Sequence, residues 1–100
     1  MAEVISSPML DGSTSLVTGG SAQNLFNSQV PQNGFCVGNP DPTNDLWVCI
    51  NGNPAAANGQ GSIRVVANGG YYATEVTQRP AFPVSVYGAV TGQKITAYYW

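Results

Sequence analysis

One hundred residues are enough for one domain with a modest hydrophobic core. Charged residues make up only 8% of the chain, against about 25% in an average soluble domain, so amide, hydroxyl and glycine groups must cover much of the surface. With three basic residues and a net charge of −2, the chain lacks the positive patch that nucleic acid or an anionic membrane surface would require. We therefore expect neither nucleic acid nor a membrane as a partner.

Neither a membrane span nor an export signal is evident in the sequence. No apolar run approaches the ~20 residues that a spanning helix needs. The opening "MAEVISSPMLDG" carries an acidic residue where a signal peptide would begin with positive charge. We therefore expect a protein that is made and used without secretion.

Residues 1–20 are expected to form an extended N-terminal arm ahead of a β domain at residues 21–100. The first twelve residues have no periodic apolar pattern, so neither a helix nor a strand is predicted there. Because chain ends without packing contacts are poorly ordered, we expect a partner to order this segment. Its apolar anchors would be Val4, Ile5, Met9 and Leu10.

The chain as a whole is predicted to be all-β. Valine leads the aliphatic residues, glycine and proline recur throughout, and no long window holds a helical apolar period. The regular spacing of the strands is typical of a small antiparallel β-sandwich or a jelly-roll-like barrel. The predicted strands are Leu16–Thr18, Asn24–Phe26, Gly34–Val37, Leu46–Ile50, Ser62–Ala67, Tyr71–Glu75, Val84–Tyr87 and Lys94–Tyr99.

The segment "GFCVGNPDPTNDLWVCI" is predicted to be a hairpin with its turn at "NPDPTN". Side chains alternate between the two faces of a strand, so Phe35 and Val37 share one face and Leu46 and Val48 share another. An antiparallel register that joins Val37 to Leu46 places Phe35 against Val48. This pairing predicts a continuous aliphatic face within one sheet.

The two cysteines lie on the opposite face of this predicted hairpin. Cys36 faces Trp47 in the expected register, and a disulfide to Cys49 is conceivable only after a register shift of two residues. Two cysteines are also too few for a disulfide framework, and no histidine accompanies them as a zinc or haem ligand. We expect two free, partly packed thiols in a reducing cytoplasm.

No motif in the sequence indicates catalysis. Histidine is missing, and neither cysteine has an activating group near it in the sequence. Asp41 and Asp45 flank a turn and could ligate calcium, but their spacing lacks the closing glutamate of a calcium loop. Turn stabilisation by Asp41, Asn44 or Asp45 is the favoured interpretation. We therefore expect a non-enzymatic protein without a metal or a cofactor.

A second hairpin is predicted in "FPVSVYGAVTGQKITAYYW", with Gly92 supplying a positive φ in the turn. The chain then ends on Tyr98, Tyr99 and Trp100. This aromatic end either closes the sheet or docks on a neighbouring molecule. Trp47 and the tyrosines remain open to three interpretations: core or cross-strand packing, a protein interface, or a surface that stacks on sugars.

Several motifs, by their order and spacing, carry a resemblance to a protein family. They are "SAQNLF", "GFCV", "DLWV", "GSIRV", "GGYY", "VSVYGAVTGQ" and the final "ITAYYW". Over Ser21 to Trp100 the chain resembles small β-sandwich virion structural proteins of tailed bacteriophages. The proline-rich "NPDPTN" and the cysteines at 36 and 49 depart from that pattern.

This resemblance implies a structural component of the virion with no catalytic residues, assembled in the host bacterial cytoplasm. The expected role is a capsid decoration (cement) protein, a homo-oligomer (dimer or trimer) that binds the major capsid protein and other virion proteins. The alternative is a head-fibre, tail-fibre or head-to-tail or baseplate accessory protein, with glycan binding as a further option. The expected interface residues are Val4, Ile5, Met9, Leu10, Trp47, Tyr98 and Trp100.

Overall fold

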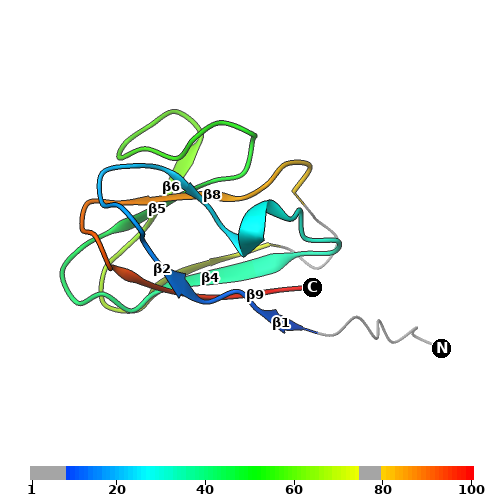
Figure 1. Cartoon of the computed structure of the whole chain (residues 1–100), viewed down its shortest axis with the longest axis horizontal. Coiled ribbons are helices and arrows are strands. Elements are labelled where there is room, and N and C mark those ends of the chain that lie inside the picture. The colour runs from blue at the N-terminus through cyan, green and yellow to red at the C-terminus, as the bar shows by residue number, and fades with distance from the viewer. Residues whose placement is uncertain (1–8, 75–79) are drawn as a thin grey trace.

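Two antiparallel β-sheets pack face to face in the computed structural model, which describes residues 9–74 and 80–100 (Figure 1). The strands of one sheet, in spatial order, are β1 (Leu10–Asp11), β9 (Lys94–Tyr99), β4 (Phe35–Asn39) and β7 (Gly70–Ala73), and β2 (Thr14–Ser15) also pairs with β9. The strands of the other sheet are β3 (Gln23–Asn24), β8 (Ser85–Gly88), β5 (Leu46–Cys49) and β6 (Ser62–Val65). The predicted small all-β sandwich is confirmed.

The core between the sheets follows the alternation of side chains along each strand. In β4, Phe35 and Val37 are fully buried, and in β5, Leu46 and Val48 are fully buried. These four residues come from opposite layers and meet in one apolar cluster. The complete cluster is Leu16, Leu25, Phe26, Phe35, Val37, Leu46, Val48, Val65, Val84, Val86, Ile95 and Ala97. The inward faces predicted from the period of two are therefore confirmed.

Most strand boundaries differ from the prediction by one or two residues, and Lys94–Tyr99 is reproduced without change. The strand predicted at Leu16–Thr18 is wrong, because the pairing with β9 occurs at Thr14–Ser15 and Leu16 instead turns into the core. The strand predicted at Asn24–Phe26 ends at Asn24, where a short 3₁₀ turn (Phe26–Ser28) follows.

Both predicted hairpins are wrong, because each turn carries the chain from one layer to the other. β4 pairs with β7 and β9, whereas β5 pairs with β6 and β8, so Phe35 and Val48 enter the core from opposite sheets and are not neighbours within one sheet. β8 and β9 likewise belong to different sheets. Gly92 in the β8–β9 turn does have a positive φ, 83°, as predicted.

The two cysteines lie on opposite outer surfaces of the sandwich. Cys36 alternates with inward-facing residues of β4 and is half-buried, and Cys49 is on the outward face of β5 and is covered by the chain that follows it. The predicted apposition of Cys36 and Trp47 is wrong, because the two residues belong to different sheets. Both thiols are free, as expected.

The β5–β6 connection, residues 50–61, joins neighbouring strands of the same sheet and lies on the outer side of this layer (Figure 1). Its backbone is tied to a row of small polar side chains on the sheet. Ala55 N donates to Ser85 Oγ (2.9 Å), and Ala56 N donates to Ser62 Oγ (3.1 Å). Cys49 Sγ lies between them and donates to Asn51 Oδ1 (2.9 Å). The connector therefore needs no charge to stay on the sheet.

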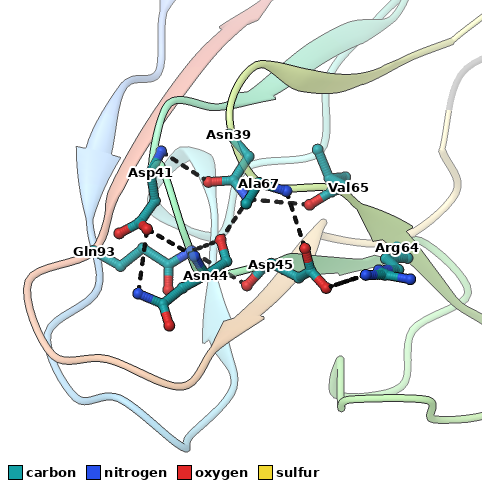
Figure 2. A network of polar contacts seen from close by, with 8 residues as sticks. All are labelled: Asn39, Asp41, Asn44, Asp45, Arg64, Val65, Ala67 and Gln93. Carbon is teal, nitrogen blue, oxygen red and sulfur yellow. Dashed lines mark hydrogen bonds and ion pairs between the residues drawn. The ribbon is translucent and has the colours of Figure 1, made fainter.

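A polar network holds the β4–β5 turn, where the chain changes layer (Figure 2). Asn39 is buried, and its Nδ2 donates to the backbone oxygens of Asn44 (2.8 Å) and Val65 (3.0 Å). Asp41 Oδ1 accepts the backbone N–H groups of Thr43 (2.9 Å) and Asn44 (2.8 Å). This arrangement is an Asx turn. The interpretation of Asp41 as a turn residue is confirmed.

The same network reaches both neighbouring layers (Figure 2). Asp45 Oδ1 accepts the Ala67 N–H (3.0 Å), and its Oδ2 accepts Arg64 Nε (2.7 Å). Gln93, buried just before β9, donates its Nε2 to the backbone oxygens of Asn44 and Asp45, each at 3.2 Å. These hydrogen bonds hold the turn to strands of both sheets. They favour a connection that runs from one sheet to the other, and disfavour a hairpin within one sheet.

Candidate interaction surface

β1 and the C-terminus lie near each other at one end of the sandwich (Figure 1). Residues from both line an apolar groove of about 420 Å³. Leu10 is held there by the pairing of β1 with β9, which sets it opposite Tyr99. The residues that line the groove are Leu10, Gln29, Val30, Pro31, Gln32, Tyr99 and Trp100. None of these side chains is charged.

Trp100 is fixed at this end by backbone hydrogen bonds. Its N–H donates to Gly34 O (3.0 Å), and its oxygen accepts the N–H groups of Asn33 (2.7 Å) and Gly34 (3.1 Å). The terminal aromatic run therefore continues the pairing of β9 with the segment that leads into β4. Of the two alternatives for this end, closure of the sheet is the one that the structure shows, and the Trp100 side chain still lines the groove.

The floor of the groove depends on aromatic packing beneath Tyr99. The Tyr99 ring lies 4.4 Å from the Phe26 ring centroid, and Phe26 makes an edge contact with Phe35 at 5.9 Å. Gly12 permits this packing, because an added Cβ there would lie 2.3 Å from the Phe26 ring. The Tyr99 hydroxyl donates to Gln29 Oε1 (3.4 Å) across the groove.

The expected interface residues do not all lie together. Leu10 and Trp100 line the groove, and Met9, 61% exposed, directly precedes Leu10. Trp47 is half-buried on the outer face of the other sheet, between Arg64 and Tyr87. Val4 and Ile5 lie outside the described residues.

Tyr98 belongs to a second surface, the outer face of the sheet that contains β9. It is 50% exposed and lies beside Cys36 on β4. Tyr71, 74% exposed, shares this face because it pairs with Gly38, two residues further along β4. We call this surface, made by Cys36, Gly38, Tyr71 and Tyr98, the tyrosine face.

Sequence reasoning missed Val30 and Pro31 in the groove. Both lie in "SQVPQ", a short irregular segment without periodicity, so no local pattern indicates which way their side chains point. Their position depends on the turn at Phe26–Ser28 that precedes them.

Within the described ranges, no cluster of three or more histidine, cysteine, aspartate or glutamate side chains is arranged to hold a metal ion. Asp41 and Asp45 are both used as acceptors in the turn network. Residues 9–74 and 80–100 also contain no helix long and apolar enough to cross a bilayer.

Hydrogen bonds shift the titration of two carboxyl groups. The N–H groups of Thr43 and Asn44 lower the pKa of Asp41 below its usual 3.8. The backbone N–H of Ser13, 2.9 Å from Asp11 Oδ1, lowers the pKa of Asp11 in the same way. Both carboxylates stabilise turns. Asp41 lines an open hollow together with Lys94, and Asp11 lines another together with Tyr99.

No family model, no curated protein and no solved structure matches this chain.

Proposed function

We propose that the protein is a non-enzymatic structural component of a tailed-phage virion, a homo-oligomeric decoration protein that binds the major capsid protein and stabilises the head shell. The observation that carries the proposal is the apolar groove beside Leu10 and Trp100, whose lining side chains carry no charge. The sequence resemblance and the β-sandwich support it.

The chemistry of the groove suits a closely fitted protein contact. Burial of an unpaired charge at an interface costs several kcal/mol, whereas aromatic and aliphatic side chains gain by leaving water. Tyr99 and Trp100 are residue types that often dominate binding energy. On a symmetric shell each contact can be modest, since many copies and several contacts per copy add avidity.

A matched pair of charge substitutions tests the role of the groove. Leu10→Asp should weaken binding to undecorated heads by at least about tenfold, since it places a charge in an apolar contact of hot-spot type. Val17→Asp adds the same charge at a site that is 77% exposed and does not line the groove, and should leave binding unchanged. Sedimentation with purified heads measures both. Equal binding by the two variants would remove the groove from the proposal.

Copy number then separates the head from the tail. A decoration protein should be present in a fixed ratio to the major capsid protein, whereas a connector or baseplate protein should be present in the few copies set by the tail axis. Quantitative mass spectrometry of purified virions distinguishes the two cases. A complete lack of affinity for any viral particle contradicts the proposal as a whole.

The tyrosine face favours a second candidate, a fibre or tail accessory protein that binds host glycans. Exposed tyrosine rings on a flat sheet can stack on sugars. For this candidate, a glycan array should show binding that Tyr71→Ser removes, while Leu10→Asp leaves it intact.

A further inference from the structure

Four Asn–Gly sequences occur in the chain, at residues 33–34, 51–52, 58–59 and 68–69. Such pairs are prone to a spontaneous reaction, because glycine has no side chain to hinder the attack of its backbone nitrogen on the preceding amide. In the folded protein the glycine N–H groups of these four pairs differ in their hydrogen bonds. We propose that Asn51 is a self-modification site, at which the folded protein converts asparagine to aspartate and isoaspartate far faster than at the other three pairs.

The reaction needs a free glycine N–H. The nitrogen must lose its proton to solvent base before it attacks the asparagine Cγ, and an N–H held by a carbonyl is neither exposed to base nor free to turn. Three of the four glycine N–H groups are held in this way: Gly34 by Trp100 O (3.1 Å), Gly59 by Ala56 O (2.9 Å) and Gly69 by Asn39 O (2.9 Å). Among the described residues, the Gly52 N–H has no hydrogen-bond partner.

The Asn51 amide is also oriented and polarised. Its Oδ1 accepts the Asn53 N–H (3.1 Å) and the Cys49 Sγ–H (2.9 Å). Since a backbone N–H can only donate, the atom it meets must be the amide oxygen. The contact with Asn53 folds the side chain back over its own following peptide, toward Gly52. Two donors on Oδ1 stabilise the negative charge that develops there during attack on Cγ.

The Asn51 amide packs against Gly61 and remains open to water. Gly61 leaves room for Asn51 Nδ2, because an added Cβ at Gly61 would lie 2.5 Å from that nitrogen. Gly52 lines an open hollow of about 250 Å³ together with Asn53 and Pro54, and both Asn51 and Gly52 are exposed. Water and hydroxide therefore reach the reacting groups.

The atoms balance with water as the other reactant. The deprotonated Gly52 nitrogen forms a bond to Asn51 Cγ, the Cγ–Nδ2 bond breaks, and ammonia leaves with a proton from solvent, so that a five-membered succinimide remains. Water then adds to either carbonyl of the ring. Opening at one carbon–nitrogen bond gives aspartate, and opening at the other gives isoaspartate, with no oxidation or reduction.

Peptide mapping of the intact protein tests this proposal. After incubation at mildly alkaline pH, the fraction converted at each of the four asparagines is measured by the mass increase for exchange of NH₂ by OH. Asn51 should convert at least about tenfold faster than Asn33, Asn58 or Asn68, the factor that corresponds to one hydrogen bond. Ion exchange gives a second readout, because each conversion adds one negative charge. A rate at Asn33, Asn58 or Asn68 equal to the rate at Asn51 in the folded protein would overturn the proposal.

The denatured chain is the matched control. In concentrated urea the four pairs lose their different hydrogen bonds, so their rates should converge. If Asn51 still leads by the same factor, local sequence and not the fold sets its rate, which contradicts the inference.

The contribution of the thiol is tested with two substitutions. Cys49→Ala removes the Sγ–H donor and should slow conversion of Asn51 in the folded protein, and Cys49→Ser retains a donor and should restore it. Neither should change the rate in urea. An unchanged rate in folded Cys49→Ala removes Cys49 from the proposal as a positioning residue. If Cys49→Ala does not fold, the site comparison in the wild-type protein alone decides the proposal.

Discussion

Asn27 adopts a backbone conformation that most residues avoid. Phe26, Asn27 and Ser28 have φ values of 58°, 52° and 65°, so three consecutive residues other than glycine lie in the left-handed region. An L-residue loses roughly 1–2 kcal/mol there relative to its favoured conformations. The buried Phe26 ring, packed on Tyr99 and Phe35, compensates for this cost and holds the turn beside the groove.

The glycine variant should therefore be more stable than the alanine variant at position 27, and less stable at position 29. Asn27→Gly should be more stable than Asn27→Ala by about 1 kcal/mol, because alanine is strained in the left-handed region. Gln29 is extended, with φ −76° and ψ 144°, so Gln29→Ala should be the more stable variant there, by about 0.5–1 kcal/mol. Urea unfolding of the four variants measures the free energies. If Asn27→Ala were as stable as Asn27→Gly, or more stable, Asn27 would not be strained.

A phenylalanine in this conformation also explains a missed prediction. The segment Asn24–Phe26 has the composition of a strand, and a bulky residue with positive φ is rare enough that no local pattern indicates it. Only the packing of the Phe26 ring shows why the strand ends at Asn24. Gly92 and Asp41 were predictable, because glycine and aspartate have strong intrinsic preferences for their turns.

The β4–β5 turn shows how a short element selects the layer in which the next strand lies. Asn39 lies at the end of β4, and its buried amide reaches β6 through Val65 O. The amide also holds the backbone of Asn44, just ahead of β5. A hairpin would instead have paired β4 with β5 directly. β4 and β5 lie in different sheets and form no backbone hydrogen bonds with each other, so the Asn39 side-chain amide supplies the hydrogen bonds at this turn.

Substitution of Asn39 should therefore lower the free energy of unfolding. Asn39→Leu, similar in volume, removes the side-chain donor to Val65 O and leaves Asn44 O with Gln93 Nε2 alone, at about 1–3 kcal/mol in the free energy of unfolding. Asn53→Leu changes an exposed asparagine and should shift it by less than about 0.5 kcal/mol. Chemical denaturation compares the two variants. A loss of less than about 1 kcal/mol in Asn39→Leu would show that other groups direct the crossing.

The molecule as a whole should lose stability in acid. Asp41 and Asp11 have their pKa values lowered in the folded state by hydrogen bonds from Thr43, Asn44 and Ser13. A carboxyl group with a lowered folded pKa stabilises the fold above its unfolded pKa, here 3.8. That contribution is lost as the pH falls below 3.8 toward the folded pKa. Because the sequence contains no histidine, stability should change little between about pH 5 and 8.

Thermal unfolding across this pH range tests the assignment. As the pH is lowered below 3.8, the unfolding temperature of the wild-type protein should decrease. The unfolding temperature of Asp41→Asn should decrease less over the same interval, because its side chain no longer titrates. A parallel decline in both proteins would place the acid sensitivity in other carboxyl groups.

Much of the sandwich follows from local sequence. The period of two in "GFCV", "DLWV" and "KITAYY" assigns inward and outward faces, because side chains alternate along any strand whatever its neighbours are. The same reasoning assigned Phe35, Val37 and Val48 to apolar faces, and all three lie in the core. The all-β class and most strand positions are predictable for the same reason.

Strand pairing and the groove were decided by the tertiary structure. A turn can lead to the next strand of the same sheet or to the opposite layer, and both routes bury the same apolar face, so the local pattern cannot distinguish them. The correct route depends on contacts between distant residues, such as Gln93 with Asn44. Leu10 and Trp100 meet in one groove while Trp47 lies on the other sheet, because pairing across the whole chain, and not alternation along a strand, brings distant side chains together.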